Sequence, residues 1–208
     1  MVSSIPAAGP WQALHPREVP PLLAAVTSRW WIAGGWALDL FVGTQTRPHE
    51  DLDIGILRLD APQVVDSMTG WEFFEAKDGR LHPLEQRVPG LEVHSLWGRP
   101  PGENRWVLEL MLEESEADTW VFRREHSIRR PLDEITVRTA EGLAHLAPEI
   151  QLLYKAKHVR SKDDADFRRV APRLDPGARA WLRDALVRLD ARHEWLTALQ
   201  VSAAPSAG

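Results

Sequence analysis

The chain has 208 residues, of which 44% are hydrophobic and 26% charged, with a formal net charge of −5 and a pI near 5.9. This composition is typical of a soluble globular protein, and the length suits one domain or two small domains in close contact. The acidic balance argues against a dedicated nucleic-acid-binding protein, although a local basic patch is compatible with it. Because the sequence has no cysteine, it excludes disulfides, thiolate metal sites and a cysteine nucleophile. Neither a leader-like start nor a membrane-length apolar run is recognisable, so we expect a cytoplasmic protein.

The first patterned segments alternate helix and strand. Apolar residues at helical spacing predict a helix within residues 18–28, and the apolar run at 30–34 predicts a short buried strand. After two glycines, helical spacing over 37–42 predicts a second helix, which Gly43 ends. The polar, proline-containing residues 43–50 are predicted to form a loop.

From residue 51 the pattern alternates as in a β-strand. Leu52, Ile54 and Ile56 fall on one face of this strand. Asp51 and Asp53 fall on the other face, so both carboxylates are expected to project from the same side.

The rest of the chain is predicted to form strands first and helices afterwards. A hairpin is expected around residues 77–79, with further strands at 91–97, 105–114 and 119–124. Pro148 opens the first of three predicted helices, which cover 148–159, 162–174 and 176–189. The predicted fold class is α+β, a mixed sheet with flanking helices followed by a C-terminal helical cap. We divide the chain into an α/β domain at 15–138, a helical region at 139–200, and tails at 1–14 and 201–208.

The two aspartates and the two glycines suggest phosphate chemistry. Like charges a few Å apart raise one another's pKa unless a cation lies between them, and Mg²⁺ prefers carboxylate oxygens, water and phosphates. A solvated strand edge is the alternative for Asp51 and Asp53. Gly34 and Gly35 lie between a strand and a helix, where backbone N–H groups can approach a phosphate, and a simple tight turn is the alternative. Only their joint order along the chain favours a single site.

This joint order resembles a known superfamily. The stretch "GGWALDLFVGTQTRPHEDLDI", residues 34–54, closely resembles nucleotidyltransferases, and within them the branch of aminoglycoside 2''-adenylyltransferases and lincosamide nucleotidyltransferases. In that branch a Gly-Gly-Trp turn, an Asp in the following helix, an Arg in the loop and a terminal Asp-x-Asp recur together. The specific match covers residues 31–56, and "WVFRREHSIRRPLDEI" and "APEIQLLYKAKHVRSKDDADF" extend the likeness over residues 20–200.

The resemblance implies a polymerase-β-like fold and transfer of a nucleoside monophosphate, expected to be AMP from ATP, to a hydroxyl group with release of pyrophosphate. It implies that Gly34 and Gly35 hold the triphosphate and that Asp51 and Asp53 bind two Mg²⁺ ions. Arg47 would contact phosphates, although without the motif a surface arginine beside an acidic neighbour is an equal interpretation.

Two further site residues are expected from the family pattern. A third carboxylate should lie on a neighbouring strand, as metal ligand and proton acceptor. Glu109 in "LELML" is our choice and Glu113 the second candidate, although many relatives have Asp here and an exposed strand glutamate is the alternative. A lysine of the helix opened by Pro148 should reach the triphosphate, with Lys155 preferred over Lys157 and a solvated helix face as the alternative.

Three neighbouring positions are given no catalytic role. Asp163 and Asp166 share a helical face with Lys162 and are predicted to brace the cap rather than to bind metal. His49 is interpreted as a loop residue.

The acceptor is the least defined part. The acidic run "LEESEAD", residues 112–118, favours a cationic or polyhydroxylated acceptor such as an aminoglycoside-like antibiotic, although such a run is also typical of a solvated turn. We expect a nucleoside triphosphate and a small hydroxyl acceptor as partners, without membrane or nucleic acid, and a homodimer is compatible. Two alternatives remain, the nucleotidyltransferase component of a toxin–antitoxin pair that modifies a protein or RNA, and a nucleotide-binding protein without turnover.

Overall fold

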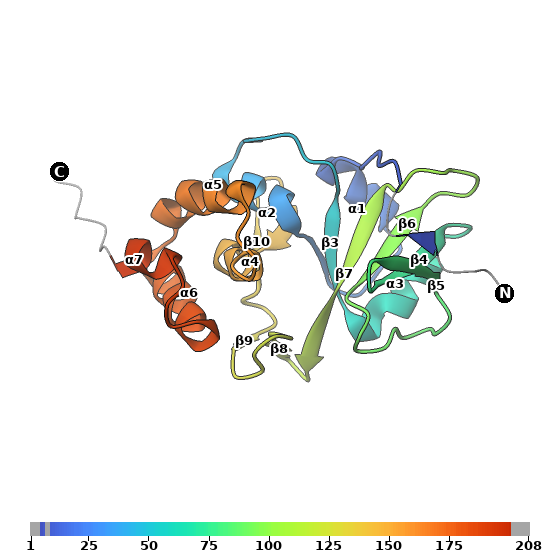
Figure 1. Cartoon of the computed structure of the whole chain (residues 1–208). Helices are drawn as coiled ribbons and strands as arrows, with labels where there is room; N and C mark the ends of the chain where they lie inside the picture. The colour runs from blue at the N-terminus through green and yellow to red at the C-terminus, as the bar shows by residue number, and fades with distance from the viewer. Residues whose placement is uncertain (1–4, 7–8, 201–208) are drawn as a thin grey trace.

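The computed structural model describes residues 5–6 and 9–200, and within them the chain forms a mixed sheet with helices on both faces (Figure 1). The strand order along the sheet is β1 (Ile5–Pro6), β5 (Arg80–Pro83), β4 (Glu72–Lys77), β6 (Ser95–Arg99), β7 (Leu108–Glu116), β3 (Asp53–Leu57), β2 (Trp30–Ile32), β11 (Ala144–Leu146) and β10 (Thr136–Arg138). A small extension pairs β8 (Thr119–Val121) with β7 and β9 (Arg129–Pro131) with β8.

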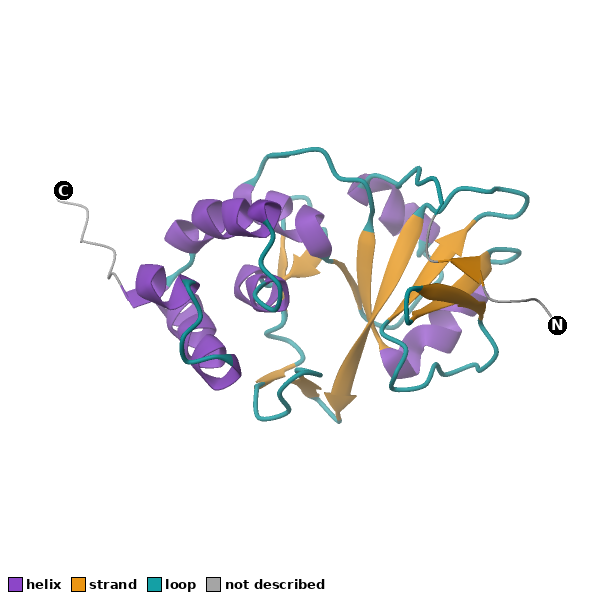
Figure 2. Cartoon of the chain, in the orientation of Figure 1, coloured by secondary structure: helices purple, strands orange, loops and turns teal. Residues whose placement is uncertain are grey.

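The helices divide between the two faces and the C-terminal end. They are α1 (Val19–Leu22), α2 (Gly34–Val42), α3 (Ala61–Ser67), α4 (Pro148–Lys155), α5 (Ser161–Val170), α6 (Pro176–Leu189) and α7 (Trp195–Gln200), with short 3₁₀ turns η1 (Pro16–Glu18), η2 (Arg58–Asp60) and η3 (Ala171–Arg173). Figure 2 shows α4 to α7 gathered at the end of the molecule away from β4 and β5. The predicted α+β class with a helical cap is therefore confirmed.

The centre of the sheet joins three strands that carry the sequence motifs. β2 runs antiparallel to β3, and β3 runs parallel to β7, with Asp53 paired to Glu109. Leu52, Ile54 and Ile56 are fully buried, as their alternation predicted, and they pack with α1 and α3. Since side chains alternate along a strand, the opposite face of β3 presents Asp53 toward the helices of the other layer.

Several element boundaries differ from the sequence prediction. The helix expected at 18–28 is shorter than predicted, because α1 covers only Val19–Leu22, with Pro20 and Pro21 in its first turn. The second helix begins at Gly34 instead of residue 37, with both glycines in its first turn. The hairpin at 77–79 is confirmed, and its turn has Asp78 and Gly79 at positive φ.

The expected N-terminal tail is partly held in the fold. The backbone N–H groups of Gln12 and Leu14 donate to the carbonyls of Trp106 and Val107, at 2.9 and 3.0 Å. Residues 1–4, 7–8 and 201–208, which include the predicted C-terminal tail, lie outside the described residues. The domain division near residue 138 stays a prediction. Within the described chain no helix is both long and apolar enough to cross a membrane.

Candidate active site

The start of α2 lies directly against the second aspartate of the Asp-x-Asp pair. Gly34 has φ +64, and a Cβ placed there would come 1.8 Å from Asp53 Oδ2. Its N–H donates to Gln151 Oε1 at 2.7 Å, which ties the turn to α4. Gly34 is therefore required both for its left-handed backbone and for the close approach of the Asp53 carboxylate.

The neighbouring glycine faces the loop that follows α2. A Cβ on Gly35 would lie 2.5 Å from Arg47 Nη2 and 2.5 Å from His49 Nδ1. The two glycines thus contact different halves of the motif, Gly34 the acidic end and Gly35 the basic loop. This packing brings the predicted segments together, and their role as one phosphate site stays a prediction.

Three carboxylates repel one another at the end of β3. Burial raises the pKa of Asp53 well above its usual value, and the charges of Glu109 and Asp51 raise it further. Burial also raises the pKa of Glu109, against the opposing effect of hydrogen bonds with Ser95 and Trp97. Among the described residues, no lysine, arginine or histidine forms an ion pair with Asp51, Asp53 or Glu109. We call these three residues the site acids.

The site acids fit a divalent cation by their chemistry. Neighbouring carboxylates that have no ion-pair partner in the described chain, two of which have a raised pKa, would be stabilised by a bound Mg²⁺. No three acidic or histidine side chains of the described residues converge closely enough to form a ready-made ion site. Of the three site acids, Glu109 is the one held by other side chains, because it is hydrogen-bonded to Ser95 and Trp97.

The second carboxylate candidate occupies a different place on β7. Glu113 is paired with Leu57, four positions beyond Asp53 and roughly 13 Å along the strand. Its Oε2 accepts hydrogen bonds from Trp120 Nε1 at 2.8 Å and from Tyr154 Oη. The register therefore brings Glu109, and not Glu113, beside Asp53.

A cavity of about 440 Å³ opens between this sheet face and α4 and α5. Gly34, Gly35, Asp51 and Asp53 line it, and Glu113 does so farther along β7. The cations around it are Arg47, Arg123, Arg124, Lys155, Lys157, Arg160 and Lys162. We call this space the central cavity. A larger groove of about 1440 Å³ lies between α2 and the β10–β11 hairpin, but none of the site acids lines it.

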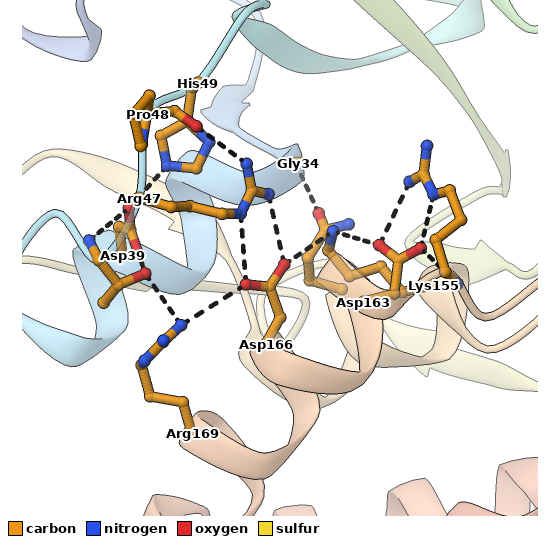
Figure 3. A network of polar contacts seen from close by, with 12 residues as sticks. Gly34, Asp39, Arg47, Pro48, His49, Lys155, Asp163, Asp166 and Arg169 are labelled. Atoms are coloured by element: carbon orange, nitrogen blue, oxygen red, sulfur yellow. Dashed lines mark hydrogen bonds and ion pairs between the residues drawn. The ribbon is translucent and has the colours of Figure 1, made fainter.

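The two predicted phosphate-binding cations are held by the same carboxylate. Arg47 Nη2 lies 3.3 Å and Lys155 Nζ 3.1 Å from Asp166 Oδ2 (Figure 3). Lys155 also contacts Asp163 Oδ1 at 2.9 Å. Asp163 pairs with Lys155 and Arg160, and Asp166 with Arg47, Lys155 and Arg169, so among the described residues neither has Lys162 as its ion-pair partner, and their bracing role stays a prediction.

The loop before the site is anchored by Asp39 of α2. Asp39 accepts a hydrogen bond from the Thr46 N–H at 3.0 Å, and its Oδ2 lies 2.6 Å from His49 Nε2. His49 packs on Trp36, with ring centroids 4.5 Å apart, and burial lowers its pKa. The sequence interpretation of His49 as an ordinary loop residue is therefore incomplete, because its buried ring fixes the loop that carries Arg47.

Sequence reasoning missed two arginines that follow β8. Arg123 Nη1 is buried and has no hydrogen-bond partner among the described residues. Arg124 Nη1 donates to the Tyr154 carbonyl at 2.9 Å. The consecutive arginines in "WVFRR" were the available signal, but only the turn after β8 brings them to the central cavity.

The acidic run at 112–118 does not form an open acidic cleft. Glu113 is buried against Trp120, Glu114 accepts from Arg58 Nε at 2.9 Å, and Glu116 accepts from Arg129 Nη2 at 3.1 Å. The run therefore gives no support to a cationic acceptor, because its glutamates have partners within the protein, and the acceptor class stays a prediction.

Comparison with known proteins agrees with this architecture. The family model described as aminoglycoside-2''-adenylyltransferase matches residues 17–100. The lincomycin-bound lincosamide antibiotic adenylyltransferase LnuA aligns with a TM-score of 0.51 at 15% identity, over 74% of this chain and 92% of that one. ANT(2'')-Ia in complex with adenylyl-2''-tobramycin aligns with a TM-score of 0.55 at 14% identity, over 84% and 98%. The solution structure of ANT(2'')-Ia gives 0.54 at 16% identity, over 88% and 92%.

None of the curated proteins matches the chain. The fold is similar to that of these adenylyltransferases, and the family model matches the part of the chain that carries the glycine and aspartate motifs. The chain therefore resembles the aminoglycoside 2''-adenylyltransferase and lincosamide nucleotidyltransferase branch, as its glycine and aspartate motifs indicated.

Proposed function

We propose that the protein is a Mg²⁺-dependent enzyme that moves AMP from ATP to a hydroxyl group of a small molecule such as an aminoglycoside-like antibiotic, releasing pyrophosphate. The observation that carries this proposal is the contact of Gly34 with Asp53, in register with Glu109, beside a cavity rich in cations. Acids and cations that line one space suit a triphosphate and its metal ions. The proposed use of ATP as donor is consistent with the cytoplasmic location that we expect for the enzyme.

The site acids would hold the metal. Asp51 and Asp53 are the proposed principal ligands and Glu109 the third, and bound Mg²⁺ would supply charge neutralisation at the reacting phosphate and the leaving pyrophosphate. The first-turn N–H groups of α2 have no acceptor within the helix, so they are suited to a phosphate oxygen. Because the Gly34 N–H already donates to Gln151, Gly35 is the better placed of the two glycines.

Proton transfer is assigned to Glu109. Burial raises the pKa of its carboxylate, and a more basic carboxylate accepts a proton from an attacking hydroxyl more readily. Arg47, Lys155 and the unpaired nitrogen of Arg123 would stabilise the negative charge of the triphosphate. Lys157 also lines the cavity and is more exposed than Lys155.

The acceptor class is supported by the family model and the related structures. The family model is that of aminoglycoside-2''-adenylyltransferase, and the ANT(2'')-Ia structure contains adenylyl-2''-tobramycin. LnuA was solved with lincomycin, so lincosamides belong in the same test. We give aminoglycosides first place because the family model carries that description.

The test is pyrophosphate release from ATP and Mg²⁺ with panels of aminoglycosides and lincosamides. We expect Asp51→Asn and Asp53→Asn to lower kcat by at least about 10²-fold, since the metal ligands would be lost. Asp184→Asn, which alters an exposed pair with Arg183 on α6, is the matched control and should retain full activity.

Wild-type-like rates in both aspartate variants would overturn the assignment of the site. ATP binding without turnover on any acceptor would instead favour a nucleotide-binding protein. Transfer of AMP only to a co-purified protein or RNA would favour the toxin–antitoxin alternative.

A further inference from the structure

We propose that Asp166 is a positioning residue of the nucleotide site, because one buried carboxylate holds both cations that are to meet the triphosphate. The proposal rests on the proposed function and assigns a role to a residue outside the Gly-Gly and Asp-x-Asp motifs. Asp166 would act through Arg47 and Lys155 and would not touch the nucleotide itself.

The geometry around Asp166 is that of a shared anchor. Its side chain is 4% exposed, and its two oxygens meet three cations (Figure 3). Oδ2 lies 3.3 Å from Arg47 Nη2 and 3.1 Å from Lys155 Nζ. Oδ1 accepts from Arg47 Nε at 3.5 Å and lies 3.8 Å from Arg169 Nη1. A buried carboxylate with this many partners has little freedom to move, so it fixes the cations that reach it.

The anchored cations come from distant parts of the chain. Arg47 belongs to the loop after α2, Lys155 ends α4, and Asp166 lies on α5. Arg47 and Lys155 both line the central cavity, as Asp53 does. Asp166 therefore connects the loop that carries Arg47 with the helix that carries Lys155, beside the central cavity.

The anchored cations keep capacity for a ligand. An ammonium has three donors, and Lys155 uses one on Asp163 and one on Asp166. A guanidinium has five, and Arg47 places donors on Asp166 and on the Pro48 carbonyl. Free donors on both side chains can therefore contact phosphate oxygens while Asp166 stays in place.

The first experiment compares steady-state kinetics of Asp166→Asn with the wild type. Asparagine keeps the size and one acceptor but removes the charge, so the cations should lose their fixed position. We expect KM for ATP to rise about tenfold, kcat to change less than about threefold, and KM for the acceptor to stay unchanged. Asp184→Asn serves as the matched control and should change neither constant. If the wild type is active and KM for ATP is unchanged in Asp166→Asn, the positioning role of Asp166 is overturned while the proposed function stands.

A double-mutant cycle separates positioning from a purely structural brace. Arg47→Gln should raise KM for ATP in the wild type and add little in the Asp166→Asn background, because both changes disable the same cation. Fully additive increases would contradict the positioning role. If Asp166→Asn does not fold, Asp166→Glu keeps the charge one methylene farther out and should raise KM for ATP with kcat preserved. A wild type that neither binds ATP nor releases pyrophosphate would overturn the proposed function and this inference together.

Discussion

At the scale of single residues, Gly34 shows how one position can meet two demands. Its φ of +64 lies in the left-handed region that side chains rarely adopt, and the Asp53 carboxylate occupies the place of a Cβ. A sequence pattern can indicate the first demand. Only the packed structure reveals the second, because Asp53 reaches Gly34 from another strand.

Gly34→Ala tests both demands against a matched glycine. Gly102 has φ +78 with nothing within 4 Å of an added Cβ, so Gly102→Ala should cost only backbone strain, about 1–2 kcal/mol of unfolding free energy. Gly34→Ala should cost more, since Asp53 must also move, and should abolish pyrophosphate release. Denaturant unfolding and activity of both variants are the measurements, and equal effects on both properties would contradict the role of the contact.

Asp163 gives a pH-dependent prediction. Burial alone would raise the pKa of its carboxyl, but hydrogen bonds from Arg160 and Lys155 outweigh burial and hold the pKa at about 2, below its ordinary 3.8. A depressed folded-state pKa contributes stability above pH 3.8 that is lost as the pH falls toward 2.

We therefore expect Asp163→Asn to lower the free energy of unfolding at pH 7, by at most about 2 kcal/mol. This is an upper bound because Arg160 is 64% exposed and its pairing is screened by solvent. The difference from the wild type should shrink between pH 4 and pH 2. Urea unfolding across this range checks it, and a gap that does not change with pH would show that charge is not the cause.

At the scale of elements, β7 presents two glutamates on one face with different surroundings. Glu109 lies beside Asp53, whereas Glu113 is buried between Trp120 of β8 and Tyr154 of α4. Burial raises the pKa of both carboxyls, so this property alone cannot distinguish them. The parallel register of β3 and β7 distinguishes them, and it supports the proposal that Glu109 takes part in the chemistry while Glu113 braces the structure.

The two glutamine variants should separate these roles. Glu109→Gln should lower kcat by about 10²–10⁴-fold, because the proposed proton acceptor is lost, with little change in stability. Glu113→Gln should lower the unfolding free energy by about 1–3 kcal/mol, since a buried hydrogen-bonded group is disturbed. Kinetics and denaturant unfolding on both proteins test this, and the reverse pattern would make Glu113 the third carboxylate.

At the scale of the whole molecule, the cap and the sheet share one hydrophobic cluster. Trp31 of β2 and Ala37 and Leu38 of α2 pack in the same cluster as Ile150 of α4 and Phe167 of α5. A second cluster lies on the other face of the sheet and is built mainly from β3, β6 and β7 with α1 and α3. The cluster under the cap thus crosses the boundary that we predicted near residue 138.

This sharing predicts cooperative unfolding. Separating the chain at residue 138 would expose the apolar face of α2, so we expect a fragment of residues 1–138 to be unstable or to aggregate. In the intact chain, thermal unfolding followed by far-ultraviolet circular dichroism and by tryptophan fluorescence should give coincident transitions. Two separated transitions, with a folded fragment, would support independent domains instead.

Much of the fold follows from local patterns. The buried face of β3, the hairpin at residues 77–79 and the helix that follows Gly34 were all predicted, because alternation, turn chemistry and helical spacing are properties of neighbouring residues. The boundary of α1 was predicted less well, since tertiary packing decides whether a proline-rich turn continues as a helix.

The sequence by itself predicted the α+β fold class and the segment that carries the candidate motif. Gly34, Gly35, Asp51 and Asp53 lie within one short segment, so strand, turn and helix rules suffice to place them on neighbouring elements. Tertiary structure decided what lies around them. The pairing of Glu109 with Asp53, the arrival of Arg123 and the anchoring of two cations on Asp166 depend on strand register and helix packing between residues far apart in the chain. Such long-range geometry leaves no periodic signal in the sequence, because each contact is set by the whole fold.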